Sequence, residues 1–104
     1  MEVNVKAFMP LIMDASQSKN YAFQALQAAK DKRESDYSVD INKSKEFLID
    51  AHKKQTEILN IDAAGSNTDI NIFLIHAMDH VSNAQVMHDL IKELAEIHLS
   101  KNNN

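Results

Sequence analysis

Two histidines and an aspartate stand together in a strongly apolar part of the sequence. His76, Asp79 and His80 interrupt the otherwise apolar run 72–80. Spacings of three and four residues place all three side chains on one face if this segment is helical. A neutral imidazole can act as a nucleophile, a metal ligand or a hydrogen-bonding group in a core. This segment is therefore the first candidate for a functional site.

Three interpretations of the segment compete on its residues alone. The first is structural: His76 is a core histidine satisfied by a neighbour, and Asp79 caps or pairs locally. The second is a zinc site, because His76 and His80 can present two ring nitrogens together. Zinc needs a third ligand, however, and the glutamate of a His-Glu-x-x-His motif is missing. The third is a phosphorylated histidine, which holds its phosphoryl group in a labile, transferable bond. Composition and spacing leave all three open.

Three helical segments are expected to position these residues. Apolar residues recur at helical spacings over 8–32, 36–64 and 68–99. The polar stretch 31–36 separates the first two segments. The second break is at Gly65, the only glycine of the sequence, which is followed by residues that favour helix N-caps. The expected fold class is all-α, an antiparallel three-helix up-down bundle.

The last segment has too many apolar residues for one narrow face. A helix that is apolar on more than one face is buried on more than one face. Because the chain offers only two other helices, we expect the extra face to meet another subunit. Among the remaining histidines, His52 is interpreted as a partly exposed surface or groove residue, and His88 and His98 as ordinary surface residues.

Composition excludes several classes of function. The 104 residues suit a single domain, 1–104, whose ends 1–7 and 100–104 are expected to fray. A net charge of −4 disfavours nucleic acid and anionic membranes as partners. Cysteine is absent, which excludes disulfides, thiol catalysis and Cys–zinc sites. The sequence has no secretory signal and no apolar run of about 20 residues, so a cytoplasmic location is expected.

Three blocks of the sequence carry a family resemblance. The segment from Leu74 to His80 resembles a V-H-A-Q-D-H-L-M block, Ala51 to Thr56 resembles A-H-x-x-Q-T, and Ala25 to Lys30 resembles A-L-x-A-A-K. All three are typical of the enzyme IIA component of the lactose/cellobiose-type phosphotransferase system. The distances between the blocks also fit, and the resemblance covers residues 11 to about 99.

The resemblance implies a homotrimer of antiparallel three-helix bundles that acts as a phosphotransferase. It identifies His76 as the residue that accepts a phosphoryl group from the phosphocarrier protein HPr. His76 would then pass the group to a cysteine of the matching enzyme IIB, and the sugar is phosphorylated during uptake through the membrane permease component. His80 and Gln55 are candidates for lining the pocket. In the family the aspartate of this block lies near the trimer axis. Asp79 is therefore expected to bind a structural Mg²⁺ together with the same aspartate of the two other subunits.

The sequence departs from the family pattern at several positions. Met78 stands in place of the family's glutamine, which is expected to weaken hydrogen bonding around the imidazole. The G-x-A-R-S motif of the first helix is 16–20 here, with Ser18 and Lys19 in place of its alanine and arginine. Val81-Ser82 stands for Leu-Met, and Lys32 occupies the position of a loop glycine.

Two other functions are compatible with a small helical chain. One is a histidine phosphotransfer domain of a signalling relay, whose usual H-x-x-K-G pattern is absent at both His76 and His52. The other is a non-enzymatic helical interaction module that functions only by forming an oligomer.

Overall fold

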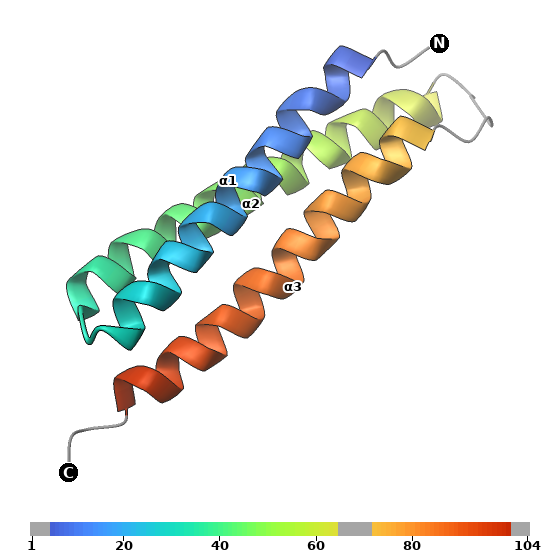
Figure 1. Ribbon diagram of the computed structural model, residues 1–104. Helices are drawn as coiled ribbons and strands as arrows, with labels where there is room; N and C mark the ends of the chain where they lie inside the picture. The colour runs from blue at the N-terminus through green and yellow to red at the C-terminus, as the bar shows by residue number, and fades with distance from the viewer. Residues whose placement is uncertain (1–4, 65–71, 101–104) are drawn as a thin grey trace.

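The computed structural model describes residues 5–64 and 72–100, and every element within them is a helix. Helix α1 spans Val5–Lys30, α2 spans Glu34–Ala64 and α3 spans Ile72–Ser100. In Figure 1 the helices lie side by side, with the start of α2 beside the end of α1 and the start of α3 at the end of the molecule where α2 finishes. The predicted all-α class and the three helices are confirmed.

The helix boundaries differ from the predicted ones by a few residues. α1 begins before Phe8 and ends before Lys32, and α2 begins before Asp36. Neither glycine nor proline marks the α1–α2 connection, so its ends have weak signals in the sequence. The predicted capping residues around Gly65 and the extreme ends of the chain lie outside the described residues. In the part that is described, none of the helices is both long and apolar enough to cross a bilayer.

α1 is the helix against which both of the others pack. Its inward face carries fully buried small residues: Ala15, Ala22, Ala25, Ala28 and Ala29. Small side chains let neighbouring helices approach closely, so Leu48 of α2 and Val81 of α3 reach one core with Phe8 and Leu11. α2 and α3 contact each other much less. The arrangement therefore leaves the seam between α2 and α3 comparatively open.

A buried hydrogen-bonded cluster ties the three helices together. Ser18 Oγ on α1 donates to the Ser44 carbonyl on α2 at 2.9 Å, and Ser44 Oγ donates to the Ser18 carbonyl at 2.8 Å. Ser44 Oγ also lies 2.8 Å from Nδ1 of His88 on α3. His88 is 7% exposed, so its interpretation as a surface residue is wrong. Its ring occupies an inward position of α3, where the hydrogen bond to the Ser44 hydroxyl satisfies a polar ring nitrogen.

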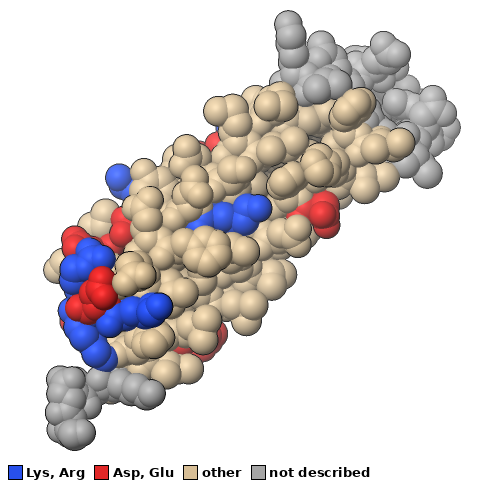
Figure 2. Space-filling view, in the orientation of Figure 1, with Lys and Arg blue, Asp and Glu red and all other residues tan. Residues whose placement is uncertain are grey.

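The turn between α1 and α2 is a Schellman motif centred on Lys32. The amide of Arg33 donates to the Ala28 carbonyl at 2.8 Å, and that of Lys32 to the Ala29 carbonyl at 3.1 Å. Lys32 has a φ of 61°, in the left-handed region where a Cβ costs roughly 1 kcal/mol. Its Nζ donates to the carbonyl of His98, which connects the turn to α3. Charged side chains gather at this end of the molecule in Figure 2.

We expect glycine at position 32 to stabilise the fold relative to alanine. The Lys32→Ala variant loses the bond to His98 but keeps the strained Cβ, whereas Lys32→Gly loses both. The free energy of unfolding of Lys32→Gly should therefore exceed that of Lys32→Ala by about 1 kcal/mol, as measured by urea denaturation. Equal stabilities of the two variants would contradict a left-handed residue at this turn.

Candidate functional site

His76 and His80 lie one turn apart on α3, with their rings in contact. Their Nε2 atoms are 3.2 Å apart, and the ring centroids are 4.6 Å apart with an angle of 86° between the planes. His76 is exposed and His80 is partly buried. His76 is therefore not a buried core histidine within the chain, contrary to the structural interpretation. A protein partner can reach its ring from solvent.

A single proton bridges the two imidazoles. A neutral histidine carries one N–H and one lone pair, so one Nε2 donates and the other accepts. If His80 donates, the accepting lone pair on His76 Nε2 is held in place and is the nucleophilic electron pair of the ring. The contact can thus orient a nucleophile and supply a hydrogen-bond donor beside it.

The environment of His80 favours its neutral form. Partial burial lowers the pKa of His80, and the positive charges of His76 and Lys19 lower it further, whereas Asp79 opposes them. Lys19 belongs to α1, so a cation from a second helix lies near the histidine pair. Lys19 was not among the residues predicted for the site, although its place in the first-helix motif, where the family has arginine, was a signal for it.

Asp79 lies on the side of α3 that faces away from the other two helices. It is exposed, as are the large apolar residues that share this outward face, namely Ile72, Ile75, Val86, Leu90 and Ile97. Within the described part of the chain, no three His, Cys, Asp or Glu side chains come together to hold a metal. The zinc interpretation therefore has no third ligand within the described chain. A site built from Asp79 requires further copies of the chain.

The structure does not bring Gln55 to His76 within one chain. His52 Nε2 lies 3.0 Å from Gln85 Oε1, so this side of α3 faces α2. Gln85 follows His76 by nine residues, or about 2.5 helical turns, which places the two on opposite sides of α3. Gln55, three residues after His52, has a buried Oε1 that accepts no hydrogen bond from the described part of the chain. Its role in the histidine pocket stays a prediction.

Met78, which replaces the family's glutamine, also lies away from His76. Two residues correspond to about 200° around a helix, so positions 76 and 78 point to nearly opposite sides. The Met78 side chain packs against the hydrophobic core. Within one chain, the substitution therefore removes no hydrogen bond from the imidazole.

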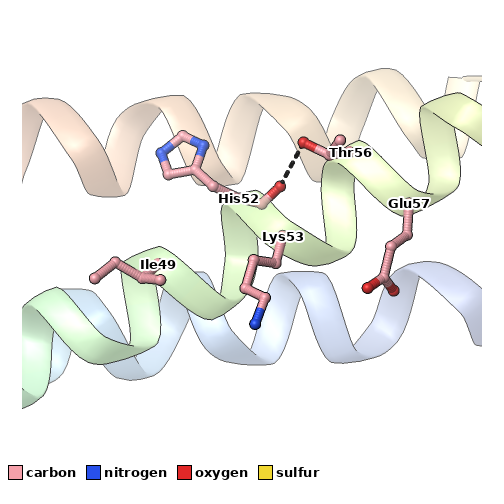
Figure 3. A pocket seen from close by; sticks show the side chains of 5 residues that line it. All are labelled: Ile49, His52, Lys53, Thr56 and Glu57. Carbon is pink, nitrogen blue, oxygen red and sulfur yellow. Dashed lines mark hydrogen bonds between the residues drawn. The ribbon is translucent and has the colours of Figure 1, made fainter.

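The block around His52 forms a hydrogen bond within α2. Thr56 Oγ1 donates to the His52 carbonyl at 3.0 Å, an i to i−4 bond within the helix. Figure 3 shows this bond and the α2 side chains of Ile49, Lys53 and Glu57, which line a pocket together with His52 and Thr56. His52 is exposed and bonded across to α3, in agreement with its interpretation as a groove residue.

Comparison with known proteins identifies the family. The family described as "PTS system, Lactose/Cellobiose specific IIA subunit" matches residues 6–99. This chain belongs to that family. The galactose-specific EIIA component of Lactococcus lactis subsp. cremoris is 37% identical over 86 residues, which are 83% of this chain and 74% of the relative. The family resemblance found in the sequence is thus confirmed, and the chain is a IIA phosphotransfer component of the lactose/cellobiose/chitobiose class.

Solved structures of IIA proteins share the fold. The cellobiose-specific enzyme IIA from Bacillus anthracis matches with a TM-score of 0.83 at 31% identity, over 94% of this chain and 91% of that one. The chitobiose IIA of Escherichia coli, solved in complex with HPr, matches with a TM-score of 0.82 at 28% identity, over 93% and 95%. The three helices described here are therefore the arrangement found in other IIA proteins.

We expect the Lys19→Gln variant to raise the pKa of His80. Removing a nearby positive charge favours the protonated imidazole, so the titration midpoint of the His80 ring should move to higher pH. An NMR titration of the histidine ring protons measures this shift, with Lys30→Gln at the end of the same helix as a control. An unchanged midpoint in Lys19→Gln would mean that this ammonium group is too far away to act on the site.

Proposed function

We propose that this chain is a phosphoryl carrier that works through His76. It accepts a phosphoryl group from phospho-HPr and passes it to the cysteine of its enzyme IIB, in support of sugar uptake through the membrane permease component. The observation that carries the proposal is the exposed His76 ring with its Nε2 3.2 Å from Nε2 of His80. The HPr complex of the E. coli relative supports HPr as the donor. A relay between such partners takes place in the cytoplasm.

The chemistry requires one nucleophilic nitrogen and one hydrogen-bond donor. The lone pair of His76 Nε2 attacks phosphorus, an N–P bond forms, and the bond to the donor breaks with its electron pair leaving on the donor. The N–H of His80 then donates to a phosphoryl oxygen instead of the His76 lone pair. In the second transfer, the IIB thiolate attacks phosphorus and the N–P electron pair returns to Nε2.

Two features of the site suit this transfer. His80 has a lowered pKa, so at neutral pH its ring is uncharged and keeps one N–H, which can donate to the phosphoryl group. The ammonium group of Lys19 offsets part of the negative charge of the phosphoryl group. Phosphoryl transfer depends mainly on positioning and charge stabilisation, and these residues supply both.

We propose further that the antiparallel bundle assembles as a homotrimer through the outward face of α3. An exposed apolar stripe of this length is unusual for a monomer and favours burial against other subunits. Asp79 lies within the stripe, so symmetry about an axis near it would bring three carboxylates together. Their oxygens suit Mg²⁺, which would neutralise their mutual repulsion and have a structural role.

Phosphorylation in vitro tests the carrier function. The protein should gain one acid-labile phosphoryl group per chain when incubated with phosphoenolpyruvate, enzyme I and HPr. His76→Ala should gain none, and His80→Ala should react roughly tenfold more slowly or worse, because a donor to the phosphoryl group is lost. His52→Ala is the matched control on α2 and should react normally. Stoichiometric phosphorylation of His76→Ala would overturn the assignment.

Sedimentation velocity tests the trimer and its metal. We expect wild-type protein with Mg²⁺ to sediment as a trimer, chelation to weaken it, and Asp79→Leu to form a trimer that ignores the chelator. Removing the three carboxylates removes the repulsion that the cation offsets. The control variant Glu96→Leu places leucine on another side of α3, and its trimer should still depend on the metal. An unaffected trimer in chelator without bound metal would contradict the proposal.

A further inference from the structure

A groove of about 240 Å³ lies between α2 and α3, apart from the histidine pair. Its walls combine charged, polar and apolar side chains, namely Lys45, Leu48, Ile49 and His52 from α2 and Gln85, His88, Asp89 and Lys92 from α3. It follows the seam where these two helices make the fewest contacts. The phosphoryl-carrier function uses none of these residues.

The imidazole of His88 is held in a fixed orientation at this groove. The ring is 7% exposed, and its Nδ1 lies 2.8 Å from Ser44 Oγ. The Ser44 hydroxyl already donates its one proton to the Ser18 carbonyl, so His88 Nδ1 is the donor to Ser44. In the neutral ring the lone pair is therefore on Nε2, on the far side of the ring from Ser44. That nitrogen is the one available to a ligand in the groove.

Positive charge gathers around this ring. Burial is the main cause of the lowered pKa of His88, Asp89 opposes it, and the ammonium groups of Lys92 and Lys45 lower it further. Lys45 and Lys92 therefore act on the ring from two different helices. Both oxygens of Asp89 accept from the Gln85 amide at 3.1 Å, which engages the one carboxylate that lines the groove. The groove therefore has two ammonium groups and one carboxylate, a local excess of positive charge in a chain of net charge −4.

We infer that this groove binds the phosphate group of a small phosphomonoester. The ammonium groups of Lys45 and Lys92 supply donors and charge for the phosphate oxygens. A phosphomonoester has a second pKa of about 6, so its monoanion can donate a proton to the His88 Nε2 lone pair. Leu48 and Ile49 give the carbon skeleton of the ligand an apolar wall. No covalent bond is made or broken.

The location separates this site from the phosphorylated histidine. Gln85 lies on the groove wall, on the opposite side of α3 from His76. A ligand in the groove would therefore leave the His76 ring accessible. The proposal is independent of the carrier function and can be tested without it.

An NMR titration at constant ionic strength tests the groove. Inorganic phosphate, glucose 6-phosphate and glucose are added separately to ¹⁵N-labelled protein. We expect saturable shifts of amides in 45–52 and 85–92 with glucose 6-phosphate, at a dissociation constant on the order of 1 mM. Inorganic phosphate should bind more weakly at the same amides, and glucose should not bind. The His76→Ala variant should show the same shifts, which separates this groove from the carrier site.

Paired charge variants show whether the binding is specific. Lys45→Gln with Lys92→Gln should weaken binding about tenfold or more, whereas Lys30→Gln with Lys53→Gln removes the same charge elsewhere and should have little effect. Equal losses in both pairs would indicate general attraction and overturn the site, as would the absence of saturable shifts with either phosphate compound. Equal affinity for phosphate and glucose 6-phosphate would overturn the part assigned to Leu48 and Ile49.

Discussion

The rotation of α3 about its own axis decides which of its side chains meet the solvent. Two constraints set that rotation: the small residues of α1, which admit one face of α3 closely, and the contact of His88 with Ser44. Apolar contacts alone would allow α3 to shift its register against its neighbours. The buried hydrogen bond does not, because such a shift would leave the polar groups of His88 and Ser44 unpaired. With His88 turned inward, Asp79 faces outward and His76 lies beside it on an accessible side.

The three helices and the shared face of His76 and His80 could be predicted from the sequence, because both depend on local patterns. Helical periodicity predicted three segments, and the i to i+4 spacing correctly predicted that His76 and His80 share a face. Helix ends were less predictable, since the α1–α2 turn has a lysine at its left-handed position, where glycine would have been a clear signal.

His88 was wrongly predicted to lie on the surface because only its residue type was considered, and not its position in the helical pattern of α3. The buried residues of α3 recur at alternating spacings of four and three: Ala77, Val81, Ala84, His88, Ile91 and Ala95. This pattern was readable in the sequence and includes His88. Its hydrogen-bonding partner was not readable, because Ser44 lies on another helix and far away in the chain. The same limit applies to Lys19, whose effect on His80 depends on how α1 packs against α3.

The departures from the family pattern fall on the scaffold and spare the imidazole pair. Ser18, where the family has alanine, adds the hydrogen bond from its Oγ to the Ser44 carbonyl, whereas the bond from Ser44 Oγ ends on the backbone carbonyl of residue 18 and does not need the serine side chain. Lys32 has a left-handed backbone conformation at the α1–α2 turn, and its side chain donates a hydrogen bond to α3. Met78 fills the core on a side of α3 that His76 does not face. The site position Lys19 keeps the positive charge of the family's arginine. Substitutions that alter packing or a turn change stability. The transfer proposed for His76 depends instead on its ring, the neighbouring His80 and local charge, so these substitutions are compatible with that proposal.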